Sequence, residues 1–138
     1  MKRTAKAHWA GSIKEGKGQL TTQSEILNQT NYSFKTRFTG EEKGTNPEEL
    51  LAAAHAGCFT MAVSLGLTEK GFNPTSLDTE ATLLMEGFDI KSIHLAIAGV
   101  VPGVDVAEFE AIVSGAEKNC LISKVLNIPI SSSASLVS

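Results

Sequence analysis

The sequence has few aromatic residues and few cysteines, and each shortage excludes a class of protein. Only 6% of its 138 residues are aromatic, so aliphatic side chains must fill most of any core. Two cysteines are too few for a secreted scaffold held together by disulfides. The length suits one domain, and we expect residues 1–138 to form a single domain with a core of its own.

The chain also lacks an excess of positive charge. Lys and Arg total 12 and Asp and Glu total 15, which gives a formal net charge of -3. Because nucleic-acid binding relies on a basic surface that releases counterions, we expect no nucleic-acid partner. The basic start, with Lys2, Arg3 and Lys6, is not followed by the apolar run of a secretory signal. We therefore expect a cytoplasmic protein, in a compartment that keeps both thiols reduced.

One long stretch without formal charge predicts the central helix of the fold. Asn46 is a good N-cap and Pro47 suits the first helical position, so we expect a helix from Pro47 to about Lys70, ended by a left-handed Gly71. Its sequence from 50 to 67, LLAAAHAGCFTMAVSLGL, is too diluted by polar residues and glycine for a membrane span, so no membrane is expected. A helix that is apolar on all sides must be enclosed by protein, and this favours burial by a second subunit.

The rest of the chain alternates between strand and helix patterns and predicts an α+β fold. Glycines near positions 11–18 favour an N-terminal hairpin or meander, and period-two alternation predicts a strand over 32–38 that turns Arg37 away from its aromatic face. We expect two more strands within 72–86 and 87–101 and an edge strand near the end of the chain. Between them, a helix starts at Asp105 and ends near Cys120, with an apolar face made of Phe109, Ile112, Val113 and Ala116.

Four residues are candidates for chemistry: Arg37, Glu48, Cys58 and Cys120. An isolated cysteine in an apolar helix is typically a packed, inert thiol. A reactive Cys58 needs a fixed cation that stabilises its thiolate, and Arg37 is the candidate. Glu48 could hold the guanidinium in place, although such residues taken alone are more often a surface ion pair that contributes about 0–1 kcal/mol.

The strings around these residues resemble the osmotically inducible protein C (OsmC) family, which is similar to the organic hydroperoxide resistance (Ohr) proteins. They are AHWAGSIKEGKG, NYSFKTRFTGEEKGTNPEELLAAAHAGCFTMAVSL, GF at 87–88, VPGVD, and Cys120 with SKVL. The resemblance covers nearly the whole chain, and the block from RFTG to AGCF is its most specific part. In the Ohr branch the arginine lies nearer the N-terminus, where this chain has Lys14 and Lys17, and this favours the OsmC branch.

The resemblance implies a thiol-dependent peroxidase that reduces organic hydroperoxides to alcohols. It implies that Cys58 is the peroxidatic and Cys120 the resolving cysteine, with Glu48 as the carboxylate of the NPE motif and Arg37 as the supporting arginine. The sulfenic acid formed on Cys58 is converted to an intramolecular disulfide, which an external, lipoyl-type or other small dithiol reduces without a bound metal or cofactor. The implied fold is an intertwined homodimer whose antiparallel sheets pack around central long helices. In one departure, Leu121 stands where the family usually has proline.

Other classes of protein remain open from the residues alone. His55 lies three residues before Cys58, so a cysteine–histidine hydrolase with His55 as base is a rival, although no third member is evident. A dimeric protein that binds a hydrophobic ligand, with both thiols incidental, is the non-enzymatic rival. A zinc site from the two cysteines and histidines would match no structural zinc spacing.

Overall fold

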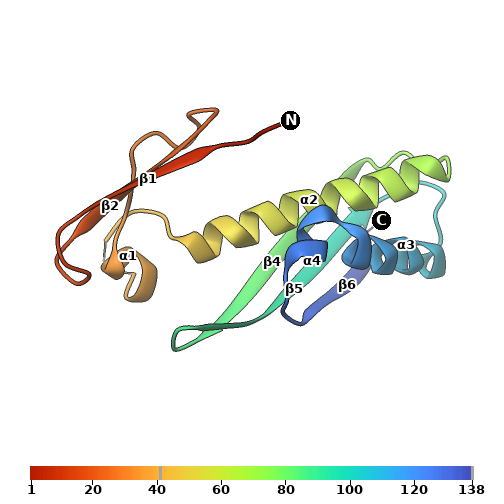
Figure 1. The fold of residues 1–138 in the computed structure, drawn as a ribbon. Coiled ribbons are helices and arrows are strands. Elements are labelled where there is room, and N and C mark those ends of the chain that lie inside the picture. Colours follow the sequence, from red (N-terminus) through yellow and green to blue (C-terminus); the bar gives the residue numbers. More distant parts are fainter. Residues whose placement is uncertain (41, 138) are drawn as a thin grey trace. The chain divides into compact units, whose positions relative to one another are not determined.

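The structure, a computed structural model, describes residues 1–40 and 42–137, which form two compact units (Figure 1). The first unit is Met1–Leu50 and the second is Leu51–Ser138. A single domain over residues 1–138 stays a prediction.

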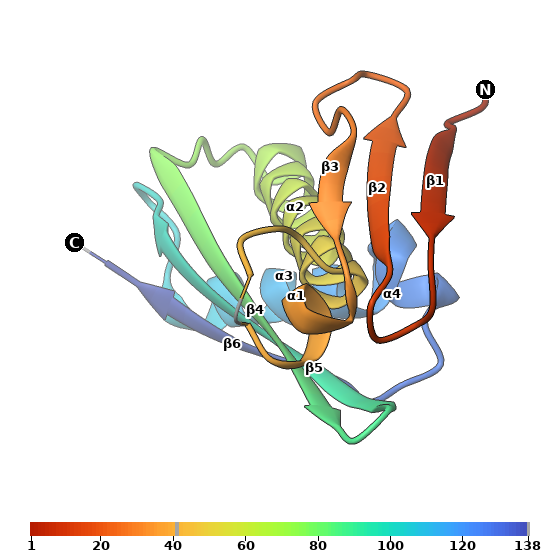
Figure 2. The ribbon, with the colours of Figure 1, turned by 90° about the vertical axis from the view of Figure 1, so that its left-hand side faces the viewer.

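The first unit contains a three-stranded antiparallel sheet in the order β1-β2-β3 (Figure 2). β1 (Ala5–Ala10) and β2 (Lys17–Thr22) form the predicted hairpin, and β3 (Thr30–Tyr32) pairs with the other edge of β2. The rings of Trp9 and Tyr32 approach each other over Gly18, with their centroids 5.6 Å apart. A Cβ atom at Gly18 would collide with both rings, so this position requires glycine.

The strand predicted over 32–38 is wrong, because residues Phe34–Phe38 form the short helix α1. Ser33 is its N-cap, and a capping box starts the helix: Thr36 N donates to Ser33 Oγ at 3.2 Å, and Ser33 N donates to Thr36 Oγ1 at 2.7 Å. These two local bonds outweigh the period-two alternation of the side chains. As a result Arg37 does not point away from the aromatic residues, and its guanidinium carbon lies 5.2 Å from the ring centroid of Phe38.

The predicted long helix is confirmed as α2 (Pro47–Glu69), which begins in the first unit and continues into the second. Asn46 Oδ1 accepts a hydrogen bond from Glu49 N at 2.7 Å, and Gly71 has a φ of 87° in the left-handed region. Among the described residues, α2 alone is long and apolar enough to cross a membrane, a test that the core helix of a soluble protein also passes.

The second unit contains the sheet β4-β5-β6, formed by β4 (Ser76–Glu86), β5 (Asp89–Val100) and β6 (Ile130–Leu136). β4 and β5 are antiparallel, but β6 runs parallel to β5, so this sheet is mixed and not purely antiparallel as expected. The helices α3 (Val106–Asn119) and α4 (Leu121–Val125) make the crossover between β5 and β6 that a parallel pair requires. β6 is the predicted edge strand.

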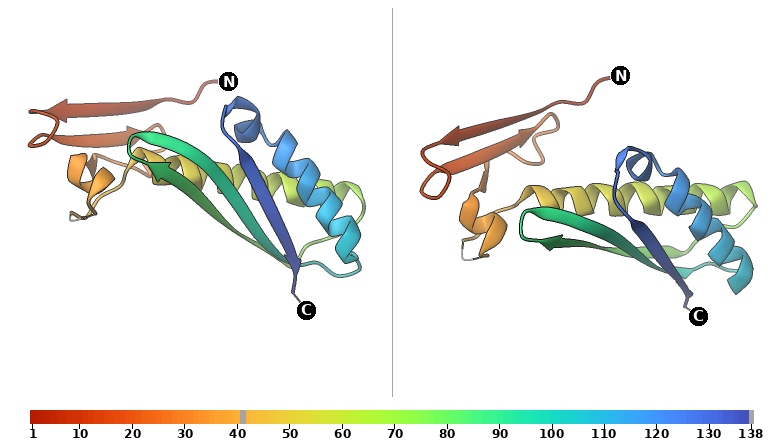
Figure 3. Two further views of the ribbon diagram at one scale, coloured as in Figure 1. Left: turned by 90° about the horizontal axis from the view of Figure 1, so that it is seen from below. Right: turned by 60° about the horizontal axis from the view of Figure 1, so that its bottom comes forward.

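The core of the second unit lies between this sheet and the helices α2 and α3, which cover the same face (Figure 3). The helix predicted from Asp105 is confirmed, since Asp105 Oδ1 accepts from Glu108 N at 2.8 Å and the four predicted apolar residues of its face are buried. The fully enclosed apolar residues come from one stripe of α2, from β5 and from α3: Phe59, Val63, Leu67, Ile93, Leu95, Ile97, Phe109 and Val113.

The opposite face of α2 is exposed within this chain. Ala53, Gly57, Met61 and Leu65 recur every four residues along it, and Met61 is 75% exposed. We call these four residues the apolar stripe. An exposed apolar stripe on a helix is typical of a surface that contacts a protein, a ligand or a membrane. Enclosure by a second subunit stays a prediction.

Candidate functional site

Arg37 and Glu48 form a tight ion pair in the first unit. Arg37 Nη2 and Nε lie 2.6 and 2.7 Å from Glu48 Oε1. Glu48 sits in the first turn of α2 and is only 9% exposed, whereas the Arg37 side chain is 41% exposed. The carboxylate therefore fixes one side of the guanidinium and leaves its other side accessible.

A mainly apolar hollow of about 280 Å³ adjoins this guanidinium within the first unit. Its wall combines four aromatic side chains with Arg37. Such a hollow suits a hydrocarbon group attached to a polar head. The residues that line it are Trp9, Ile13, Tyr32, Ser33, Phe34, Arg37 and Phe38.

Cys58 lies in the second unit, in the part of α2 that packs on the sheet. It is a free thiol, half-buried, and it packs against the apolar core. It differs from an inert core cysteine because its own side chain is only half-buried. The approach of Arg37 to Cys58 would join the two units and stays a prediction.

Cys120 is a free thiol with only 2% exposure, at the junction where α3 ends and α4 begins. Its sulfur accepts a hydrogen bond from Ser123 N at 3.3 Å, and Ser123 Oγ lies 3.1 Å from the same sulfur. Two donors from one residue are therefore available to this sulfur. The predicted end of the preceding helix near Cys120 is confirmed.

The local backbone explains why the chain tolerates Leu121 in place of proline. Cys120 has φ -62° and ψ 144°, the extended conformation that a following proline would impose. Leu121 occupies the first position of α4, where proline is favoured, and its side chain is 71% exposed. The chain thus adopts, without proline, the geometry that proline would fix.

His55 has a partner that the sequence did not reveal. It is completely buried, and its Nε2 lies 2.7 Å from Ser123 Oγ. Burial lowers the pKa of His55, which favours the neutral ring. The ring is thus connected through Ser123 to Cys120, whereas the hydrolase hypothesis needs it to act on Cys58. The spacing of three residues between Cys120 and Ser123, typical of an N-cap acceptor and the backbone N–H that donates to it, was the available signal for the Cys120–Ser123 contact.

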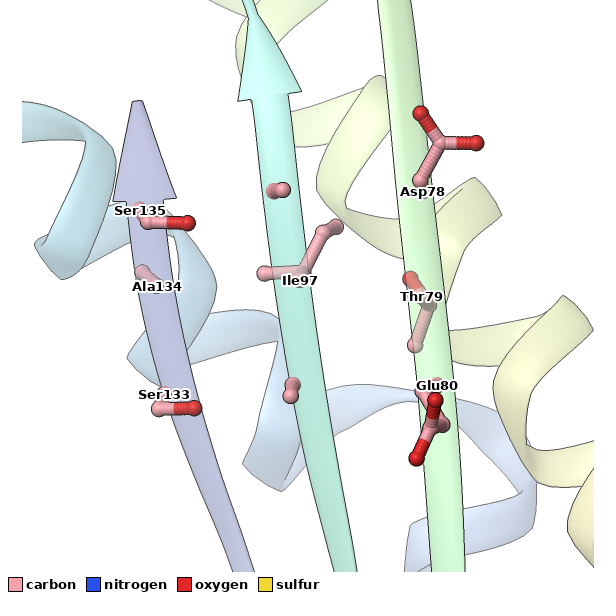
Figure 4. A pocket seen from close by; sticks show the side chains of 9 residues that line it. Asp78, Thr79, Glu80, Ile97, Ser133, Ala134 and Ser135 are labelled. Carbon is pink, nitrogen blue, oxygen red and sulfur yellow. The ribbon is translucent and has the colours of Figure 1, made fainter. Parts of the chain in front are cut away.

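Two further features of the described residues bear on the kind of site, the spacing of possible metal ligands and a hollow on the second sheet. Within residues 1–40 and 42–137, no three His, Cys, Asp or Glu side chains lie close enough together to hold a metal ion. The hollow on the sheet of the second unit, about 550 Å³, is lined by Asp78 and Glu80 of β4, by β5, and by Ser133 and Ser135 of β6 (Figure 4). Without a cysteine or a cation in its lining, it does not suit thiolate chemistry.

Comparison of the sequence with known proteins gives consistent matches. Residues 40–133 match the family model described as OsmC-like protein. The chain is 52% identical over 128 residues to Peroxiredoxin OsmC of Escherichia coli strain K12, which covers 90% of this chain and 89% of that protein. It is 37% identical over 87 residues to the organic hydroperoxide resistance protein OhrA of Bacillus subtilis, covering 60% of each chain.

Solved structures match the fold along nearly the whole chain. The organic hydroperoxide resistance protein OhrB of Bacillus subtilis has a TM-score of 0.68 at 23% identity, covering 97% of this chain and 98% of that one. An OsmC-like protein of Vibrio cholerae has a TM-score of 0.75 at 13% identity, covering 97% and 99%. At these identities the likeness establishes the fold alone, and it confirms the α+β class predicted from the sequence.

Proposed function

We propose, from the premise that this chain belongs to the family of OsmC-like proteins, that it is a cysteine-dependent peroxidase that reduces organic hydroperoxides to alcohols. The observation that carries the proposal is the 52% identity with a peroxiredoxin over 90% of the chain. The two free thiols and the oriented guanidinium of Arg37 are the groups that such an activity needs.

In the proposed reaction the thiolate of Cys58 attacks one oxygen of the hydroperoxide. The S–O bond forms while the O–O bond breaks, and the departing alkoxide takes up a proton to give the alcohol. Negative charge moves from the sulfur to the leaving oxygen, so a cation placed along this path stabilises the transition state more than the ground state. We assign that role to Arg37, with Glu48 as the residue that orients it.

The hollow beside Arg37 supports the proposed substrate class. Its aromatic wall can cover an alkyl or aryl group, which hydrogen peroxide lacks. Bulky organic hydroperoxides are therefore the proposed substrates, in preference to hydrogen peroxide. Arg37, which also lines the hollow, carries donors that suit the peroxide oxygens.

The second half of the reaction uses Cys120. Its sulfur attacks the sulfenic acid of Cys58, forms a disulfide and releases water, before further oxidation of Cys58 can occur. An external dithiol, of lipoyl or other small type, then returns both thiols, and no bound metal or cofactor takes part. A cytoplasmic location fits this cycle, because a reducing compartment supplies the dithiol.

We also propose that the protein works as a homodimer whose interface covers the apolar stripe of α2. The support is the continuous exposed row of Ala53, Gly57, Met61 and Leu65. Single exposed apolar residues need no explanation, but a continuous row of them is typical of an interface. Met61→Glu should give monomers in sedimentation velocity, because a carboxylate would be buried at the interface. Val106→Glu, at an exposed apolar site on α3, is the matched control and should stay dimeric. A dimeric Met61→Glu protein would contradict this interface.

A thiol titration with cumene hydroperoxide tests the proposed activity. One equivalent should remove two thiols from the wild-type protein and none from Cys58→Ser. Cys120→Ser should lose one thiol and then stop, since its sulfenic acid has no resolving partner. An unchanged thiol count in the wild-type protein would refute the peroxidase and favour a binding protein that takes up the hydroperoxide without reaction.

The hydrolase rival makes a different prediction. It requires ester turnover that His55→Ala abolishes and that hydroperoxide does not affect. The position of His55 Nε2 against Ser123, and not at Cys58, disfavours it.

A further inference from the structure

A polar network in the second unit links the buried His55, the half-buried Ser123 and the buried Cys120. His55 Nε2 lies 2.7 Å from Ser123 Oγ, and Ser123 Oγ lies 3.1 Å from Cys120 Sγ. His55 is completely enclosed and its Nδ1 has no hydrogen-bond partner among the described residues. A buried polar atom without a hydrogen-bond partner costs free energy, so the position of His55 calls for an explanation.

The unpartnered Nδ1 of His55 indicates which atom donates in each hydrogen bond of this network. Buried N–H groups without an acceptor are rarer than acceptors without a donor, so we assign the single proton of the neutral ring to Nε2. Nε2–H then donates to Ser123 Oγ. The hydroxyl, already an acceptor, directs its own proton to Cys120 Sγ, where the backbone N–H of Ser123 donates as well.

We propose that Ser123, held in place by His55, activates Cys120 as the resolving nucleophile by directing two hydrogen-bond donors at its sulfur. Both residues are positioning residues, because they act through Cys120. Donors directed at a sulfur favour its thiolate over its thiol, and the thiolate is the form that attacks. This inference rests on the proposed peroxidase activity and concerns only its second step.

The step itself balances without an added reactant. The Cys120 thiolate forms the S–S bond with Cys58, the S–O bond of the sulfenic acid breaks, and the departing hydroxide takes up the proton that Cys120 had lost. One water molecule is released, Cys120 is oxidised and the Cys58 sulfur is reduced. The network supplies no electrons and changes only how readily Cys120 reacts.

A purely structural role for the same contacts is the alternative, since Cys120 Sγ also caps the short helix α4. The two roles differ in kinetics. Loss of a structural contact would alter stability and would not act on one chemical step alone, whereas the proposed role slows disulfide formation and leaves sulfenate formation unchanged.

Single-turnover kinetics with cumene hydroperoxide separate these two steps. Hydroperoxide consumption reports the first step, and loss of dimedone-reactive sulfenic acid, with disulfide identified by mass, reports the second. Ser123→Ala should slow the second step about tenfold or more, as expected for loss of a donor to a charged acceptor, with the first step unchanged. Ser123→Thr keeps the hydroxyl and should restore the second step.

Ser132→Ala is the matched control, because it removes a hydroxyl that donates to Glu117 in the same unit. It should leave both steps at the wild-type rate. A second pair tests His55 even if Ser123→Ala folds poorly. His55→Leu should slow the second step, whereas His55→Gln, whose amide can donate to Ser123, should restore most of it.

The outcomes are distinct. No first step in the wild-type protein refutes the proposed function itself. A normal first step together with a second step that is unchanged in both Ser123→Ala and His55→Leu overturns the inference and leaves the peroxidase standing. Equal slowing of both steps, without rescue by Ser123→Thr, assigns the contacts to structure alone and also overturns it.

Discussion

The Arg37–Glu48 pair gives the sharpest quantitative prediction, a coupling free energy of about 1–2 kcal/mol. Two contacts of 2.6 and 2.7 Å converge on one carboxylate oxygen that is largely out of water, which favours a strong pair. Exposed pairs contribute about 0–1 kcal/mol, and breaking a fully buried pair costs about 3–5 kcal/mol. Because the Arg37 side chain is 41% exposed, water screens the pair, and we place its coupling between these limits.

A double-mutant cycle measures this coupling. Urea unfolding of wild type, Arg37→Ala, Glu48→Gln and the double variant, at one protomer concentration, gives the four free energies of unfolding. The cycle removes the separate contact of Arg37 with the Phe38 ring, which the single substitution also loses. Arg37→Ala should be the more destabilising single change, because it leaves the buried Glu48 carboxylate without a partner.

A coupling below about 1 kcal/mol would refute this reasoning, since it would make the pair an ordinary surface ion pair. Glu48 would then not anchor the guanidinium, and its assignment as an orienting residue would fail. A coupling in the predicted range, with the fold intact, supports a guanidinium that is held in place before substrate arrives.

Three further predictions concern the second unit. Leu121→Pro should raise the free energy of unfolding by about 0.4–1 kcal/mol in urea titrations, because Cys120 already has the backbone that proline requires; destabilisation would contradict this geometry. Acidification should destabilise the protein through His55. Burial lowers the pKa of His55 in the folded state below the unfolded value near 6.5. The contribution of the neutral buried ring to the free energy of unfolding is therefore complete above that pH and is lost as the pH falls. His55→Gln should therefore lose less stability than wild type between pH 7.5 and 5, and an equal loss would count against a buried neutral ring. Gly66→Ala should lower the thermal midpoint, since its Cβ would lie 2.8 Å from Ile112 Cγ2 at the contact of α2 with α3, and an unchanged or higher midpoint would mean that Ile112 yields easily.

The sequence predicted the elements whose ends are marked by local chemistry. Asn46 and Pro47 fixed the start of α2 and Gly71 its end, and each does so through a bond or a dihedral that depends on near neighbours alone. The apolar face of α3 followed from its spacing for the same reason. In the first unit, the glycines of the hairpin predicted β1 and β2.

The features that the sequence missed depend on contacts that compete or lie far apart. At residues 34–38 the Ser33–Thr36 capping box competed with a period-two pattern and prevailed. The parallel pairing of β6 depends on where the α3–α4 crossover returns the chain. The contact of His55 with Ser123 joins residues 68 positions apart, so no local sequence pattern predicts it.

The central claim is that a fixed cation, Arg37, makes Cys58 react with organic hydroperoxides. The most direct measurement is the second-order rate constant for sulfenic acid formation with cumene hydroperoxide, in a Cys120→Ser background where Cys58 is the sole thiol. Arg37→Ala should lower this constant about a hundredfold, as removal of one transition-state donor typically does, while the protein stays folded. An Arg37→Ala protein that reacts as fast as its parent would contradict the account.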